Sequence, residues 1–266
     1  MEQTETTLST TCPSCAAAQA NQAISPFVYA IGRIDLRYPR PSIEKELAHV
    51  IGRSPTAGLT DKEALQTVLN DRQNRYLARQ LCWVFTVQGQ DTYILTPRDP
   101  LDLDLLIQSL RPAPSPTDMD AVVGMRGPLA TPDVCNGLIL PILFFDQIYS
   151  FGRDSLLEAL PQPRDVEPKK FTSAAAEVFD RLMQQSDNTG ASGADRALNF
   201  LAVRDATVYA TAARAFANNS SLSAVSVKPS PLNGARNIVD VVFTFTNRAT
   251  DVQEKYFTRG GVNGRR

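Results

Sequence analysis

The chain has 266 residues, of which 43% are apolar, and its formal net charge is −1. This length suffices for one large domain or two small ones, each with its own hydrophobic core. The balanced charge argues against nucleic-acid binding as the main function, because phosphate recognition needs a basic surface. Residues 1–23 lack the basic and apolar regions of a secretory signal, and the apolar run LILPILFF at 138–145 is far shorter than the ~20 residues of a membrane-spanning helix. We therefore expect a soluble, cytoplasmic protein without a nucleic-acid or membrane partner.

The N-terminal part of the chain changes character at residue 26. Residues 1–25 are rich in Thr, Ser, Ala and Gln without periodicity, which predicts a flexible segment. The next run, FVYAIGRIDL at 27–36, combines β-branched and aromatic residues and predicts a strand. Helices are expected at 43–51, from an apolar stripe, and at 60–76, which opens with the Thr and Glu of a capping box.

A hairpin and a further helix are predicted in the next stretch. The runs CWVFTV (82–87) and TYIL (92–95) flank a short Gln-Gly-Gln-Asp turn, a pattern typical of a β-hairpin. Asp99 followed by proline predicts a helix start, since Asp caps the first turn and proline fits the first helical position. The apolar runs at 121–125 and 138–151 are then expected to form strands.

A Pro-rich stretch at 160–170 is the best candidate for a boundary within the chain. One amphipathic helix is expected after it, with Val178 and Leu182 on the apolar face. A longer helix follows, whose apolar stripe runs from Leu198 to Phe216. Three strands of an antiparallel meander are then predicted at 222–229, 237–247 and 252–259.

The order of these elements indicates the fold class. Helices and strands occur in blocks rather than in strict β-α-β alternation, which favours α+β with mainly antiparallel sheets and helices packed on them. We divide the chain into a flexible N-terminal segment (1–25), an N-terminal α+β half (26–160) and a C-terminal half of two helices and a meander (161–266). The two halves are expected to associate intimately, and each is expected to have an open sheet edge.

Four cysteines provide the candidate metal ligands. Cys12 and Cys15 have the C-x-x-C spacing with which two thiolates bind one zinc ion. Since a second such pair is absent, Cys82, Cys135 or His49 would have to complete the site, unless another chain supplies ligands. A redox pair and a tail without a required site are the alternatives. In a cytosolic chain these cysteines are expected to be thiols or metal ligands rather than a disulfide framework.

Few residues qualify as catalytic candidates. Asp205 falls on the apolar stripe of the long predicted helix, where a half-buried carboxylate needs a partner, either an Arg such as Arg204 or Arg196 or backbone donors. A structural ion pair and a catalytic carboxylate are the two interpretations. Cys135 lies beside a predicted turn, which favours access to it. His49 is the sole histidine, and its position off the apolar stripe predicts exposure to solvent. Phosphate-loop, dinucleotide, metalloprotease and hydrolase motifs are absent, so the residues alone indicate no recognisable active site.

Three long passages resemble a known family. They are PFVYAIGRIDLRYPRPSIEKELAHVIGR (26–53), DRQNRYLARQLCWVFTVQGQDTYILTPRD (71–99) and the segment from RALNFLAVRD to DVQEKYFTR (196–259). They resemble the domain of unknown function at the C-termini of the PatA/PatG cyanobactin maturation proteases. The resemblance covers nearly all of residues 26–260.

The resemblance implies a setting, namely the maturation of a ribosomally made, post-translationally modified peptide. The chain lacks the Asp, His and Ser constellation of the accompanying protease, so protease activity is not expected. Cysteine pairs before the first strand in some relatives are similar to Cys12 and Cys15, which favours the zinc interpretation. The family domain has no established activity to carry over, so no catalytic residue follows from the resemblance.

Three hypotheses follow for the function. The first is an accessory or recognition protein that binds the precursor peptide or a maturation enzyme, by strand addition at an open sheet edge. The second is a new type of enzyme that modifies the precursor, using Asp205, Cys135 or a metal at the cysteine pair. The third is a structural module that forms a homodimer.

Overall fold

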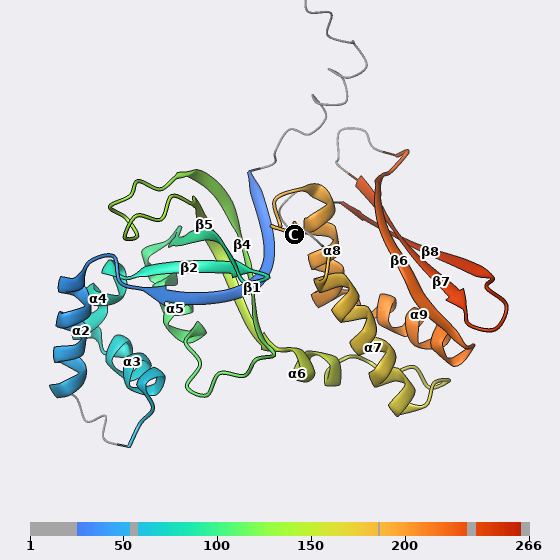
Figure 1. Cartoon of the computed structure of the whole chain (residues 1–266), viewed down its shortest axis with the longest axis horizontal. Helices are drawn as coiled ribbons and strands as arrows, with labels where there is room; N and C mark the ends of the chain where they lie inside the picture. The colour runs from blue at the N-terminus through green and yellow to red at the C-terminus, as the bar shows by residue number, and fades with distance from the viewer. Residues whose placement is uncertain (1–25, 54–57, 186, 233–237, 262–266) are drawn as a thin grey trace, which may run out of the picture.

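The computed structural model describes residues 26–53, 58–185, 187–232 and 238–261. These residues form a β-barrel with its own helices, followed by a layer of helices on a three-stranded sheet (Figure 1). The elements in chain order are β1 (Phe27–Arg37), α2 (Pro41–Arg53), α3 (Asp61–Asn70), η1 (Arg72–Asn74), α4 (Arg75–Gln80), β2 (Cys82–Val87), β3 (Gln90–Pro97), η2 (Pro100–Asp102), α5 (Leu103–Ser109), β4 (Asp118–Leu129), β5 (Pro141–Gly152), α6 (Arg153–Glu158), α7 (Pro168–Met183), α8 (Gly193–Arg204), α9 (Ala206–Ala217), β6 (Ser220–Pro229), β7 (Ile238–Asn247) and β8 (Gln253–Gly261). The predicted α+β class with mainly antiparallel sheets is confirmed.

The first five strands close into a barrel in the order β1-β2-β3-β5-β4. Every neighbouring pair is antiparallel except β3 and β5, which run parallel. Closure depends on β1, whose first half pairs with β4 and whose second half pairs with β2. At the change of partner stands Gly32, where a Cβ atom would collide with the carbonyl oxygen of Thr86. The prediction of an open sheet edge in this half is wrong, because pairing between strands distant in sequence cannot be read from local patterns.

The barrel strands and α2–α5 share one apolar core. Large side chains that are fully buried there include Phe85, Tyr93, Leu106 and Phe145. The capping box that opens α3 and the β2–β3 hairpin are both present as predicted. The helix predicted at 60–76 is interrupted, however. Asp71 adopts an extended conformation after α3, and its carboxylate caps the 3₁₀ turn that follows, so α4 begins as a separate helix.

The C-terminal half packs α7, α8 and α9 on one face of the sheet β6-β7-β8. The meander and its apolar face are as predicted, with Val241, Phe243 and Phe245 of β7 buried. The long helix predicted across Leu198 to Phe216 is wrong, since Asp205 ends α8 and begins α9. Its side chain satisfies a backbone donor at the start of α9, and this local hydrogen bond competes with a continuous helix.

Contacts along β1 join the two halves. Figure 1 shows α8 between the barrel and the sheet, and it contacts both β1 and β7. The backbone of Tyr29 donates to the carbonyl oxygen of Gly190 at 3.0 Å, and its own carbonyl accepts from Asn199 Nδ2 at 2.7 Å. In addition, Ile31, Ala121 and Phe151 of the barrel wall belong to the same buried cluster as the helices α7–α9. The barrel and the C-terminal half are therefore intimately associated.

Candidate functional site

The outer edge of β8 is one of the two edges of the three-stranded sheet that have no strand partner in the described part of the chain. In the three-stranded sheet β7 is central, and β8 pairs with β7 from Gln253 to Gly261. No other described strand pairs with β8 (Figure 1). β6 is the opposite edge of the sheet, and it contacts α7 and α9, which cover one face. Half of the backbone donors and acceptors of β8 consequently point away from the sheet without a strand partner.

Two exposed aromatic side chains mark β8. Tyr256 is 41% exposed and Phe257 is 69% exposed. Tyr256 pairs with the buried Phe243, so it lies on the face of the sheet that the helices cover. Phe257 pairs with Val242 and belongs to the opposite face. Neither residue was predicted as a site residue from the sequence, although adjacent aromatic residues in a strand must point to opposite faces of the sheet.

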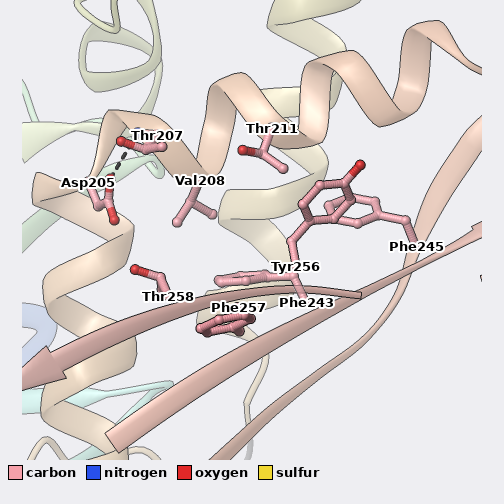
Figure 2. A pocket seen from close by; sticks show the side chains of 9 residues that line it. All are labelled: Asp205, Thr207, Val208, Thr211, Phe243, Phe245, Tyr256, Phe257 and Thr258. Carbon is pink, nitrogen blue, oxygen red and sulfur yellow. Dashed lines mark hydrogen bonds between the residues drawn. The ribbon is translucent and has the colours of Figure 1, made fainter. Parts of the chain in front are cut away.

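A groove lies between the start of α9 and the strands β7 and β8, and its volume is about 140 Å³. Figure 2 shows the helix on one side and the aromatic side chains of the strands on the other. The lining residues are Asp205, Thr207, Val208, Thr211, Phe243, Phe245, Tyr256, Phe257 and Thr258. The groove thus combines an aromatic wall with hydroxyl groups and one carboxylate, next to the free strand edge.

Asp205 lines this groove, but its surroundings differ from those predicted. The residue is half-buried, and its Oδ1 accepts a hydrogen bond from the backbone N–H of Thr207 at 2.9 Å (Figure 2). The ion pair considered with Arg204 or Arg196 is not recorded among the described contacts. Arg204 lies over the ring of Tyr149, 5.5 Å from its centroid, whereas Arg196 donates to the carbonyl oxygen of Ala191 at 2.6 Å. Of the two environments envisaged for Asp205, the structure has the one with backbone donors.

Cys82 and Cys135 form a disulfide in the structure. Both residues are buried, and their Cα atoms are 5.5 Å apart, within the range that a disulfide spans. The prediction that these two cysteines are thiols is therefore wrong. In the disulfide neither residue has a thiolate with which to act as a nucleophile or to bind zinc. The two residues are 53 positions apart, and no local pattern indicates that the chain brings them together.

Of the remaining metal candidates, only His49 lies within the described residues. Cys12 and Cys15 lie outside the described residues, so the zinc hypothesis for them stays a prediction. His49 lies on α2 with its side chain exposed, as its position predicted. Within the described ranges, no group of three or more His, Cys, Asp or Glu residues is arranged to hold a metal ion.

The carboxylate of Asp120, which was not predicted as a site residue from the sequence, is buried and only 1% exposed. It accepts hydrogen bonds from Ser150 Oγ at 2.6 Å, from the backbone N–H of Ile34 at 3.1 Å and from Arg111 Nη2 at 3.1 Å. Burial raises its pKa, and the hydrogen bond from Ser150 and the charge of Arg111 oppose that rise. Because its partners are all protein groups that tie β1, β4 and β5 together, we assign this carboxylate a structural role.

A second hollow, of about 340 Å³, lies on the barrel beside the start of α2. It is lined by Leu36, Arg37, Tyr38, Arg40, Pro41, Glu44 and Asn136. Arg37 is already paired with Asp91 at 2.8 Å. The residues that line this hollow all belong to the barrel half, which distinguishes it from the groove beside β8. In the described part of the chain, no helix has both the length and the apolar character needed to cross a bilayer.

Fold and site together define an α+β protein in which a closed barrel is joined to a helix-covered sheet with a free edge. The family model described as PatG Domain matches residues 27–225, and the chain belongs to this family. A solved structure described as "PatG Domain of Unknown Function" is similar over 88% of this chain and 92% of that chain, with a TM-score of 0.69 and 21% identity. At this identity the likeness shows the shared fold alone. No curated protein matches the chain.

Proposed function

We propose that this chain is a recognition protein in the biosynthesis of a ribosomally made, post-translationally modified peptide of the cyanobactin type. In this proposal it binds the precursor peptide in an extended conformation, as a strand added to β8. Membership of the PatG domain family supports the setting, since the family is linked to cyanobactin biosynthesis. The observation that carries the binding mode is the free edge of β8 with a groove directly beside it.

Strand addition suits this edge for a physical reason. Along β8, alternate residues direct their N–H and C=O groups outward, and an extended peptide can pair with them at the ~4.8 Å spacing of neighbouring strands. Backbone pairing supplies affinity for many sequences, while a side-chain pocket supplies selectivity. The barrel offers no comparable edge, because its five strands pair in a closed ring.

The charges on β8 support a binding edge rather than an aggregating one. Glu254, Lys255 and Arg259 are exposed along the strand. Charged side chains on an edge strand discourage uncontrolled pairing of identical sheets. Arg259 is held against Asp240 on the neighbouring strand, with Nε and Oδ1 2.6 Å apart. These charges leave the backbone edge available while they disfavour stacking of many copies.

Calorimetric titration tests the proposal with short synthetic peptides that tile a cyanobactin precursor, together with a strand-forming peptide of alternating Thr and Val. Each peptide that binds is then prepared in two forms, one with the backbone nitrogens of its odd-numbered residues methylated and one with those of its even-numbered residues methylated. Strand addition predicts that one form loses binding and the other keeps it, since only alternate amides face the partner strand. If none of the peptides binds, or if both methylated forms bind as well as the parent, the proposal fails.

Two proline variants of β8 provide a matched pair on the protein. Glu254 and Lys255 are neighbours in β8, so their N–H groups point to opposite edges. The proline that removes a hydrogen bond to β7 is expected to destabilise the sheet, whereas the other is expected to keep the fold. The fold-preserving variant should bind the peptides at least about tenfold more weakly, because a donor at the edge is lost and the ring obstructs pairing. Undiminished binding by that variant would contradict the proposal.

The other two hypotheses give different results in the same experiments. A homodimerisation module would sediment as a dimer that the peptides do not dissociate, and the fold-preserving proline variant would be monomeric. A peptide-modifying enzyme would change the mass of the precursor after co-expression. A recognition protein is expected to bind the precursor and leave its mass unchanged.

A further inference from the structure

We infer that the groove between α9 and β8 selects an aromatic side chain of the added strand, and that Asp205 selects a positively charged residue near it. This inference rests on the proposed function, because it takes an extended peptide along β8 as the occupant. It adds the class of peptide that is preferred. The preferred strand has an aromatic residue and, two positions away on the same face, Lys or Arg.

The size and lining of the groove fit one aromatic ring. Its volume of about 140 Å³ is close to the ~150 Å³ of an engineered apolar cavity that binds benzene. Phe243 and Phe245 belong to its wall, and Tyr256 stands edge-on to Phe245, with ring centroids 5.7 Å apart and planes at 77°. Phe243 and Phe245 are buried, whereas Tyr256 is half-exposed, so a further ring can meet the ring of Tyr256 in the edge-to-face or offset arrangement that aromatic pairs prefer.

Side chains of an added strand would approach the groove from the correct side. Tyr256 and Thr258 pair with Phe243 and Val241 and therefore share the helix-facing surface of the sheet. A strand beyond β8 directs alternate side chains to this same surface, beside those of its neighbour. Such a side chain would lie next to Tyr256 and face α9, where Thr211 lines the groove (Figure 2).

Asp205 gives the groove a negative charge that no described ion pair neutralises. The C-terminus of α8 and the N-terminus of α9 meet at this residue, so the opposite ends of two helix dipoles largely cancel there. The other residues that line the groove are uncharged. A cationic group on the ligand is the complementary partner for this carboxylate.

A second copy of the chain is a poorer occupant. If β8 paired with β8 of another copy, Tyr256 of that copy would be the aromatic residue offered to the groove. The charged residue two positions from Tyr256 on the same face is Glu254. It would bring a like charge toward Asp205, which disfavours the pairing. A separate peptide with a basic residue does not have this conflict.

The test uses three synthetic peptides of the form Thr-Xaa-Thr-Phe-Thr-Xaa-Thr, acetylated and amidated, in which Xaa is Lys, Gln or Glu. Placing Xaa on both sides of Phe makes the comparison independent of strand direction. We expect the affinities to fall in the order Lys, Gln, Glu by roughly three- to fivefold a step, as for a partly exposed ion pair at low salt. Replacing Phe by Ala is expected to weaken each peptide by roughly tenfold or more.

Two matched variants assign these preferences to the groove. In Asp205→Asn the Lys-over-Glu preference should collapse while the unfolding midpoint stays the same, because Asn caps a helix as well as Asp. Asp99→Asn is the control, since Asp99 caps η2 with a similar bond to Leu101 N at 2.9 Å but lies in the other half. That variant should keep the preference. Thr211→Leu, which fills part of the groove, should reduce the advantage of Phe over Ala.

The outcomes separate this inference from the function on which it rests. If none of the peptides binds, the proposed function is overturned together with the inference. If they bind with one affinity whatever Xaa is, or if Asp205→Asn keeps the full Lys preference, the inference about charge is overturned while strand addition stands. Equal binding of the Phe and Ala peptides would overturn the aromatic pocket.

Discussion

The barrel and the three-stranded sheet differ in whether their strands have neighbours on both sides. In the barrel, β1 changes partner at Gly32 and closes the ring, so that each strand has a neighbour on both sides. In the sheet, β8 pairs with β7 and has no strand beyond it in the described chain. The barrel strands therefore pair with one another, while the sheet leaves a row of backbone donors and acceptors on β8 without a strand partner in the described chain. Under the proposed function, the barrel is the stable support and the sheet is the recognition element.

The largest contrast is expected between a barrel core residue and an edge residue. Phe145 is fully buried in the barrel core, so Phe145→Ala should lower the free energy of unfolding by about 3–5 kcal/mol. Tyr256 is half-exposed, and Tyr256→Ala should lower that free energy by about 1 kcal/mol, the worth of its aromatic contact with Phe245. Urea denaturation of both variants checks this. Equal losses would mean that β8 is part of the main stabilising core.

The disulfide is expected to stabilise the barrel without affecting recognition. Cys82 and Cys135 close a long loop, so replacing both with Ser should lower the free energy of unfolding by about 2–4 kcal/mol. Peptide affinity at β8 should not change, because the disulfide lies in the barrel half. Denaturation and titration with and without reductant measure the two effects separately. A stability that does not respond to reductant would contradict the pairing of these cysteines.

The contact between the two halves should give an intermediate effect. Asn199→Ala removes the donor to the carbonyl oxygen of Tyr29 and leaves Asn188 without its side-chain partner. Buried groups that lose a hydrogen-bond partner cost about 1–3 kcal/mol. Phe200→Ala, on an exposed position of the same helix, removes only an edge-to-face ring contact with Tyr29 and should cost less. If the two variants are equally stable, the polar contacts along β1 are not what joins the halves.

The smallest expected effect is on stability at acid pH. One carboxylate in each half contributes to it, and the two contributions change in opposite directions as the pH falls. Burial raises the pKa of Asp120 in the barrel, so its contribution to stability increases as the pH falls through the folded-state pKa. The hydrogen bond from Arg259 lowers the pKa of Asp240 in the sheet, so its contribution is lost as the pH falls through that lower pKa.

Urea midpoints from neutral to about pH 3 check this, since aspartates titrate near the lower limit. As the pH falls, the stability of Asp120→Asn should decrease more steeply than that of the unmodified chain. The stability of Asp240→Asn should decrease less steeply. Opposite slopes would contradict the assigned causes of the two pKa shifts.

Features that depend on a few neighbouring residues were predicted from the sequence. The capping box of Thr60 and Glu63 and the hairpin of β2 and β3 are examples, because each is defined within a few positions. The buried face of β7 was likewise indicated by alternation of apolar residues. Such patterns are enough to recognise the α+β class and, with longer passages, the family.

Features that depend on distant residues were not predicted. Closure of the barrel requires β1 to pair with β4, and the disulfide requires Cys82 to contact Cys135. No pattern of neighbouring residues predicts either contact. Asp205 was noticed as unusual, but the apolar stripe around it suggested one helix, whereas its capping bond to Thr207 divides two. The groove could not be predicted either, because its lining comes from α9, β7 and β8 together.

Hydrogen exchange of the backbone amides, with and without a bound strand peptide, tests strand addition at β8 most directly. The account predicts that alternate amides of β8, those that face away from β7, become protected on binding, while the barrel amides keep their exchange rates. Protection that is confined to the barrel, or no change along β8 when the peptide is bound, would contradict it.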